Sequence, residues 1–273
     1  MSEESVLLLR LAGPLQSWGA PYVLNRRETR PEPTKSGILG LLAAAAGRAR
    51  EEPLGELLGL RLGVRVDQAG TLLRDYHTSS DYRGAPLPQA GVNAKGTQRP
   101  TAPAKHTYVT QRFYLQDAVF LVGVQGETPL IRTLAAAVRA PAFPLALGRR
   151  SCVPTQPIYL GTRELGLAEA LTAEPWQVSE HARQVYERSR TPGGKPRGRP
   201  ATIDLSATLD VVEVPGQPAV VAEEVRDVPT SFDPLHRGFA HRKVRRVWLN
   251  VPTGFPNPDP EASGHDPFAL LGW

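Results

Sequence analysis

The stretch LALGRRSCVP contains the residues of this chain whose types are best suited to chemistry. Gly148 lets the backbone approach a ligand closely, and Arg149 and Arg150 present forked N–H donors for phosphate oxygens or base edges. Ser151 adds a hydroxyl group, and Cys152 is the only cysteine of the chain. Three interpretations follow: a catalytic thiol beside an anion-binding fork, a structural turn, or a binding site for a phosphodiester backbone.

The thiol interpretation is the weakest of the three. A nucleophilic cysteine needs a partnering histidine and an exposed, electropositive site, and no protease or redox signature surrounds Cys152. A lone cysteine beside a strand is usually a small buried hydrophobe. No acidic residue occurs between Glu127 and Glu164, so Arg149 and Arg150 lack local carboxylate partners. The pattern favours anion binding by the two arginines.

A second basic group precedes a predicted helix in NRRETRPEPTKSG. Arg26, Arg27, Arg30 and Lys35 come shortly before or at the helix start, where free N–H groups and the helix dipole favour phosphate, and Ser36 is suited to cap the helix. The glycine spacing of a Walker A loop is absent. An ordinary cap with a solvated charged loop explains the pattern equally well.

Lys105, His106 and Tyr108 form the one cluster suited to metal-free RNA cleavage. There the histidine would act as general acid or base, and the lysine would stabilise the phosphorane charge. Simple phosphate binding by these residues and the nearby Arg112 is the favoured interpretation. The histidines show no metal-ligand spacing beyond an isolated pair, His236 and His241, so we expect no metal or other cofactor.

Alternating strand and helix patterns must position these groups. Pro141 ends the second helix and Thr128 is its expected cap, whereas Gly47 ends the first, with arginines in its last turn. The predicted elements are a strand over 5–12, a helix over 36–50, a hairpin of strands 60–67 and 71–78, a strand over 107–124, a helix over 128–140 and a strand over 155–162. This order is that of the split βαβ, or ferredoxin-like, unit, an antiparallel sheet with two helices on one face.

The remaining segments suggest an excursion and a second unit. Residues 78–107 are rich in Pro and Gly without apolar period, so we expect them to protrude from the domain formed by 1–162. Residues 163–273 are expected to form a smaller β-rich lobe after a basic linker at 184–201. Its predicted strands are 201–214 and 241–251, and a loose Pro-rich tail follows.

Composition limits the class of protein and its partners. With 273 residues and 41% hydrophobic residues, the chain can bury a core, and its net charge is +5. Basic runs without any acid lie between Asp81 and Asp117, Glu127 and Glu164, and Asp233 and Asp259, and they contain Tyr, Phe and Trp. Each run alone is equally typical of a solvated face, but together they favour nucleic acid. A single cysteine and an N-terminus without a signal or membrane segment predict a cytoplasmic protein and no membrane partner.

Six stretches together form a recognisable set: LLLRLAGPLQSWG, RPEPTKSGILGLLAAAAGR, DYHT, QRFYLQDAVFLV, LGRRSCVPTQPIYLGT and the C-terminal DVPTSFDPLHRGFAHRKVRRVW. These stretches resemble the CasD family, which holds the 5′ handle of the CRISPR RNA in type I-E CRISPR Cascade. They occur in the same order as in the family and cover most of the chain.

The resemblance implies a ferredoxin-like (RRM-like) domain whose thumb, at about 78–107, folds over the guide RNA and packs on a Cascade backbone subunit. It also implies contact with the large subunit, and with target DNA through the complex. The residues expected to bind RNA are Arg26, Arg27, Lys35, Ser36, Lys105, His106, Tyr108, Arg112, Gly148, Arg149, Arg150 and Ser151. Type I-C relatives cleave precursor RNA with Tyr, Lys and His, so a metal-independent endoribonuclease is the alternative. A purely structural bridging subunit is the third possibility.

Overall fold

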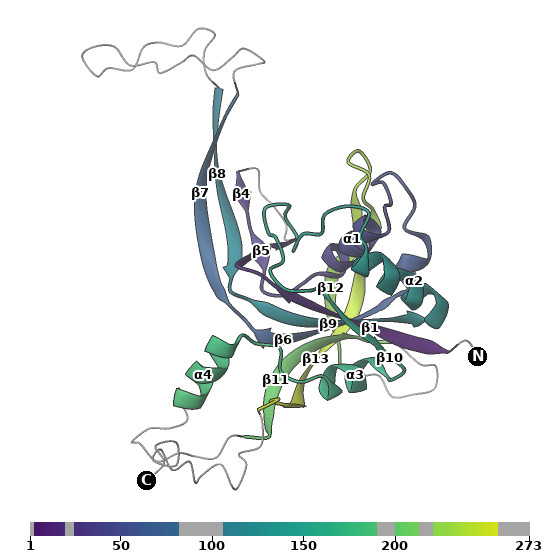
Figure 1. Cartoon of the computed structure of the whole chain (residues 1–273). Helices are drawn as coiled ribbons and strands as arrows, with labels where there is room; N and C mark the ends of the chain where they lie inside the picture. The colour runs from purple at the N-terminus through teal and green to yellow at the C-terminus, as the bar shows by residue number, and fades with distance from the viewer. Residues whose placement is uncertain (1–2, 20–24, 82–105, 190–199, 213–220, 256–273) are drawn as a thin grey trace, which may run out of the picture.

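A seven-stranded sheet forms the centre of the molecule (Figure 1). The structure is a computed structural model, and it describes residues 3–19, 25–81, 106–189, 200–212 and 221–255. The strand order is β10-β1-β9-β6-β11-β13-β12, and neighbouring strands are antiparallel. The strands are β1 (Glu4–Ala12), β6 (Arg61–Gln68), β9 (Val119–Glu127), β10 (Tyr159–Arg163), β11 (Thr202–Asp210), β12 (Glu223–Ser231) and β13 (Gly238–Pro252).

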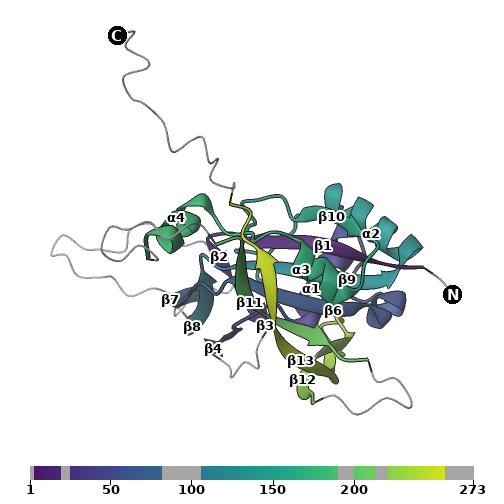
Figure 2. The same cartoon turned by 90° about the horizontal axis from the view of Figure 1, so that it is seen from below.

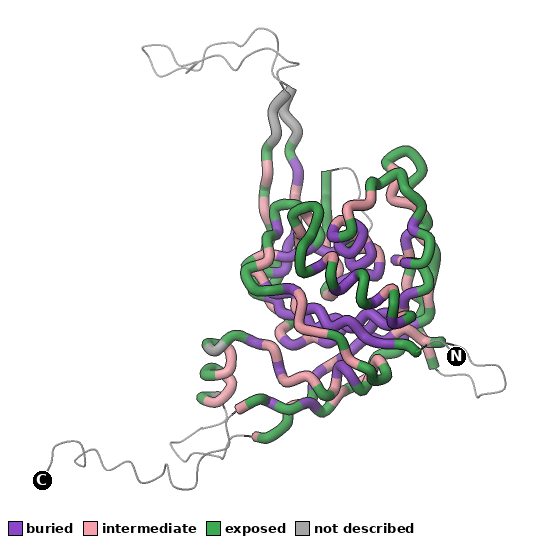
Figure 3. The backbone as a smooth tube through the Cα atoms, turned by 45° about the vertical axis from the view of Figure 1, so that its right-hand side comes forward, coloured by how far each residue is buried: buried purple, intermediate pink, exposed green. Residues whose placement is uncertain are grey.

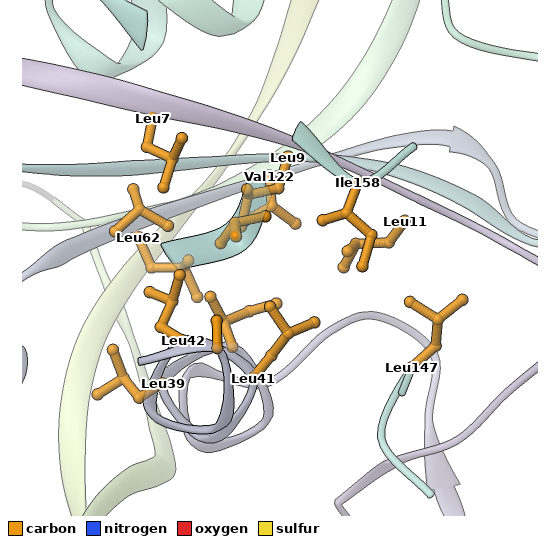
Figure 4. Close-up of a cluster of buried hydrophobic side chains, with 14 of the residues drawn as sticks. Leu7, Leu9, Leu11, Leu39, Leu41, Leu42, Leu62, Val122, Leu147 and Ile158 are labelled. Atoms are coloured by element: carbon orange, nitrogen blue, oxygen red, sulfur yellow. The ribbon is translucent and has the colours of Figure 1, made fainter. Parts of the chain in front are cut away.

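Strand β1 is buried on both faces of this sheet. Successive side chains of a strand point to opposite faces, so a continuous apolar run such as VLLLRLA supplies two cores. Leu7, Leu9 and Leu11 pack in the core that contains helices α1 (Lys35–Ala45) and α2 (Thr128–Arg139), as Figure 4 shows. Val6 and Leu8 pack in a second core with α3 (Leu167–Ala173) on the opposite face.

The predicted order of strands and helices is confirmed, but one hairpin is wrong. Strand β6 pairs with β9 and β11, whereas β7 (Thr71–Asp81) pairs with β8 (His106–Gln116). The predicted strand 107–124 is therefore two strands, β8 and β9, which separate at Asp117, where φ is +55°. The turn at Ala69 and Gly70 does not close a hairpin between β6 and β7. It directs β7 away from the central sheet to pair with β8.

Strands β7 and β8 form a projecting two-stranded arm (Figures 1 and 3). At its base, Gly70 has a φ of +72°, and a Cβ there would lie 2.5 Å from the Gln116 carbonyl oxygen. Gln16 Nε2 donates to the carbonyl oxygens of Leu11, at 3.0 Å, and Ala118, at 2.7 Å. These contacts attach the arm to the sheet. The expected thumb thus begins as strands, and its remaining residues, 82–105, lie outside the described part of the chain.

Short strands surround the base of the arm. Of these, β2 (Leu15–Gln16) and β4 (Arg26–Arg27) pair with β8, and β3 (Trp18–Gly19) pairs with β5 (Thr29–Arg30). In the segment between β1 and α1, where no element was predicted, β2 and β4 extend the sheet that the arm forms, and β3 and β5 form a separate two-stranded sheet.

The C-terminal region extends the central sheet. It contains strands, as expected for 163–273, but β11, β13 and β12 continue outward from β6, as Figure 2 shows. The sheet therefore crosses the expected boundary between 162 and 163 and does not repeat the first unit. Helix α4 (Glu180–Ser189) occupies the start of the predicted linker 184–201, and residues 190–199 lie outside the described part. A 3₁₀ helix, η1 (Gly55–Gly59), precedes β6.

Both long helices begin differently from the prediction. Thr34, not Ser36, caps α1, because its Oγ1 accepts a hydrogen bond from the Gly37 N–H at 3.2 Å. Thr128 lies inside α2, and its hydroxyl donates to the Glu3 carbonyl oxygen at 2.7 Å. Gly47, with a φ of +76°, follows α1 as expected, but the last turn of α1 contains no basic residue.

Candidate nucleic-acid interface

The turn at Gly148–Ser151 requires its glycine. Gly148 has a φ of +89°, and a Cβ there would lie 1.8 Å from the Ser17 carbonyl oxygen. The Ser17 N–H donates to the Leu147 carbonyl oxygen at 3.1 Å, and the Leu147 N–H donates to that of Cys152 at 2.8 Å. The buried side chain of Leu147 lies in the core (Figure 4). The turn therefore has a fixed place beside the segment that precedes β3.

Arg149 connects this turn to the base of the arm. Its Nη1 donates to the Phe113 carbonyl oxygen at 3.1 Å, and its Nη2 donates to the carbonyl oxygens of Arg27, at 2.8 Å, and Glu28, at 3.3 Å. The guanidinium also lies over the Tyr114 ring, 4.8 Å from its centroid. Arg149 was predicted to contact RNA, but main-chain carbonyls occupy its donors. Its role in this geometry is to position the turn against β4 and β8.

Arg150 and Ser151, in contrast, are exposed at the turn. Within the described residues, the Arg150 side chain makes no hydrogen bond or ion pair. Its guanidinium donors are therefore available to an outside ligand, which suits a phosphate group.

Strand β4 brings further cations to the same place. Arg26 and Arg27 are exposed, and they pair in parallel register with Gln111 and Arg112 of β8. The Arg26 guanidinium lies 4.9 Å from the centroid of the Phe113 ring, and its Nε lies 2.7 Å from Glu28 Oε1. Arg112 is half-buried and donates from Nε to Thr110 Oγ1 at 3.3 Å. We call the surface made by Arg26, Arg27, Arg112 and Arg150 the arm-base surface.

The phosphate-binding site predicted at the start of α1 is occupied by carboxylates of the protein itself. Lys35 Nζ forms a buried ion pair with Asp210 Oδ2 at 2.9 Å, and its main-chain N–H donates to Asp227 Oδ2 at 2.8 Å. Arg242 contacts both carboxylates. Ser36 is half-buried, with its hydroxyl 3.2 Å from Thr34 Oγ1. Lys35 therefore belongs to a buried charge cluster, and we do not retain it as an RNA contact.

The predicted cleavage cluster stays a prediction. Lys105 lies outside the described residues, and for His106 and Tyr108 only the backbone is described, opposite Asp81 and Ser79 in the arm. Cys152 is buried, and burial raises the pKa of its thiol. That shift disfavours the thiolate and agrees with a packing role.

The described residues contain neither a candidate metal site nor a candidate membrane-spanning helix. No group of three or more His, Cys, Asp or Glu side chains in the described ranges is placed to hold a metal ion. Among the same residues, no helix is long and apolar enough to cross a membrane.

Fold and surface together define an α+β protein, as predicted, with a mainly antiparallel sheet and an arginine-rich surface at the base of a projecting arm. The chain belongs to the family described as CRISPR-associated protein (Cas_Cas5), whose model matches residues 6–245. The resemblance recognised in the sequence motifs is thereby confirmed.

Individual relatives agree with this assignment. Over 178 residues, the chain is 38% identical to the CRISPR system Cascade subunit CasD of Escherichia coli (strain K12), covering 58% of this chain and 71% of that one. A solved structure described as a Cas protein has 37% identity and a TM-score of 0.61, covering 92% of this chain and 100% of the other. A chain from a CRISPR RNA-guided surveillance complex has 33% identity and a TM-score of 0.65, with 94% and 96% covered.

Proposed function

We propose that this chain is a non-catalytic, RNA-binding subunit of a type I-E-like CRISPR Cascade surveillance complex. In that complex it clamps the 5′ handle of the CRISPR RNA. Family membership, the identity to a Cascade subunit and the likeness to a chain of a surveillance complex support the setting. The RNA-binding role is carried by one observation: Arg149 joins the turn that contains Arg150 to the backbone of Arg27, and Arg27 pairs with Arg112 of β8 at the base of the arm.

The order of the first 163 residues supports a ferredoxin-like (RRM-like) unit. The elements follow as β1, α1, β6, β9, α2 and β10, and the corresponding strands are ordered β10-β1-β9-β6. This is the strand-helix order of the split βαβ unit, with the arm inserted between β6 and β9. We infer that the arm is the thumb, which meets a Cascade backbone subunit, and that the large subunit binds nearby and brings target DNA to the complex.

The chemistry of the arm-base surface suits the backbone of a single strand. Exposed arginines supply bidentate donors to phosphates, and contact with the Phe113 ring orients the guanidinium plane of Arg26. Cys152 offers no accessible nucleophile, which favours binding over covalent chemistry. The affinity should fall as the salt concentration rises. Each phosphate of a single strand that the protein neutralises contributes about −0.7 to the slope of log K against log salt concentration, and the magnitude of this slope is called the salt slope below.

The test is RNA retention by the purified complex. Changing Arg27 and Arg150 to Ala should reduce the CRISPR RNA that co-purifies and should lower the affinity of the pure chain for handle RNA. Arg132→Ala, an exposed arginine on α2, removes the same charge elsewhere and should leave both unchanged. Undiminished RNA retention in the double variant would contradict the proposal.

Catalysis is tested separately. The pure chain is incubated with CRISPR repeat RNA in EDTA, alongside His106→Ala. Specific cleavage that the variant lacks would establish the endoribonuclease instead. Salt-independent RNA binding, or none, would favour the structural bridging subunit.

A further inference from the structure

Trp248 on β13 is an exposed aromatic residue in an ordered strand. Its side chain is 75% exposed, whereas Trp18 is fully buried and Trp176 is 6% exposed. Its strand neighbours Val247 and Leu249 point to the other face and pack in the apolar clusters there. The strand is therefore anchored from one side, and the indole projects from the other.

The surroundings of Trp248 leave the ring accessible. Its partner across the ladder, on β11, is the small residue Ser206. On the opposite edge, β12 pairs with β13 only from Gly238 to Val244, so no described strand flanks Trp248 there. A planar ligand could reach the indole from that edge.

A basic residue adjoins the ring on the same face. Arg246 lies two positions before Trp248, about 7 Å along the strand, and its side chain is 62% exposed. Within the described residues its ion pair is with the exposed Glu223, with 3.4 Å between Arg246 Nε and Glu223 Oε2, and it also interacts electrostatically with Glu32. An exposed ring with a guanidinium two residues away on the same face of a strand suits single-stranded nucleic acid. Bases stack on aromatic rings, and phosphates pair with arginines.

The register connects this pair to the arm-base surface. Arg246 lies opposite Thr208 on β11, and the Thr208 hydroxyl donates to Glu32 at 3.0 Å. Glu32 belongs to the same chain segment as Arg27, five residues earlier, whose carbonyl oxygen accepts from Arg149. The segment from Arg27 to Glu32 therefore runs from the turn at Gly148–Ser151 to the β13 surface.

We propose that Trp248 is a stacking platform for one base of the bound RNA, and that Arg246 contacts the adjoining phosphate. The inference rests on the proposed function and extends it to a place that the arm-base surface does not include. A strand held by Arg150 and Arg27 would continue along the Arg27–Glu32 segment and place a base on the indole.

Binding of handle RNA to the full chain tests the pair, measured across a series of salt concentrations. Trp248→Ala should weaken binding about 10-fold with an unchanged salt slope, because stacking involves no counterion release. Trp248→Phe should retain most of the affinity, and Trp248→Leu should not. Arg246→Ala should lower the salt slope by about 0.7. Leu235→Ala, an exposed apolar residue in the β12–β13 turn, is the matched control and should change nothing.

A second series locates the base. Handle RNAs with a single abasic nucleotide at successive positions should reveal one position where the wild-type chain loses affinity and Trp248→Ala loses nothing further. If Trp248→Ala binds every RNA like wild type while the Arg27 and Arg150 variant does not, the platform is wrong and the proposed function stands. Loss of complex assembly with RNA affinity intact would assign Trp248 to a protein contact and also overturn it. No RNA binding by wild type would overturn the proposed function itself.

Discussion

The start of α1 and the turn at Gly148–Ser151 both place basic residues beside backbone that suits an anion, yet one is closed and the other is open. At α1, Asp227 receives the Lys35 N–H and Asp210 receives its ammonium group. At the turn, Arg149 is satisfied by carbonyl oxygens and Arg150 faces solvent. The difference teaches that a basic stretch stays available to a ligand only where the fold does not bury it against carboxylates of its own.

The closed site is electrically balanced. Lys35 and Arg242 face Asp210 and Asp227, and all four side chains are at least 89% buried. Buried charges cost solvation free energy, which their partners offset only while each partner is present. The arm-base surface lacks a buried cluster of this kind: its acidic neighbours in the described part of the chain are Glu28, which pairs with Arg26, and Asp75, which lies opposite Arg112 in the arm. Its remaining charge is available to a polyanion.

The largest expected effect comes from removing a carboxylate from the buried charge cluster at the start of α1. Asp227→Ala leaves the Arg242 guanidinium and the Lys35 N–H without their partner, so we expect a loss of about 3–5 kcal/mol in the free energy of unfolding. Urea unfolding followed by circular dichroism measures it. Glu51→Ala, an exposed acid, should change the value by less than about 0.5 kcal/mol. Equal stabilities of the two variants would show that the cluster does not hold α1 in place.

Distortion of the open site should have the next largest effect. Gly148→Ala forces a Cβ toward the Ser17 carbonyl oxygen at positive φ, which should cost about 2 kcal/mol or more and displace Arg150. Urea unfolding and handle-RNA titration should both report a loss. A variant with wild-type stability would mean that the turn has room that the structure does not show.

The third expected effect is that substitutions of Arg149 and Arg150 differ in their consequences for stability and for RNA binding. Arg149→Ala removes main-chain contacts to β4 and β8 and should cost about 1–2 kcal/mol of stability. Arg150→Ala should cost less than about 0.5 kcal/mol but reduce the salt slope of RNA binding by about 0.7. Paired unfolding and binding curves make the comparison. Identical behaviour of both variants would remove the distinction between a positioning and a contacting arginine.

The smallest effect concerns Glu32, whose pKa is raised chiefly by burial, against the hydrogen bond from Thr208. A raised folded-state pKa means that the folded chain binds the proton more tightly than the unfolded chain. The resulting stability is full below the ordinary pKa and is lost as pH rises through the raised one. Glu32→Gln should therefore flatten this pH dependence and change stability at pH 8 by less than about 1 kcal/mol. Unfolding curves from pH 4 to pH 8 measure it, and parallel profiles for variant and wild type would contradict it.

Local patterns predicted the elements better than their partners. The run VLLLRLA and the stretch from Thr128 to Pro141 contain their own periodicity and boundaries, and both elements formed where expected. The pairing of β7 with β8 could not be predicted, because Gly70 and Asp117 are equally compatible with a tight hairpin and with separating strands. Of the C-terminal strands, β11 and β13 formed where expected and β12 was missed, and nothing local indicates that they join β6.

The candidate site was predictable in composition and less so in role. Gly148 and Arg150 were identified from residue types alone, and the structure shows a glycine-dependent turn at positive φ and an exposed cation. Lys35 looked equally suited to phosphate, since its partners Asp210 and Asp227 are 175 and 192 residues away. Arg149 likewise depends on carbonyl oxygens that only the folded chain brings near. Trp248 lay within a basic run that the sequence showed. Its exposure could not be predicted, because it depends on which face of the sheet β13 presents to solvent.

The chain leaves the central sheet at Gly70 and returns to it at Asp117, and the length of the arm between them sets a fixed distance. Each of its strands has 11 residues, which at about 3.3 Å per residue makes the described strands about 35 Å long. The end at Phe113–Leu115 is buried against the core, and the remainder sets the distance at which a neighbour bound at the far end is held. Removing one cross-strand pair would turn every outer side chain to the other face, whereas removing two would preserve the faces. Arm length is therefore expected to differ among relatives in steps of about 7 Å.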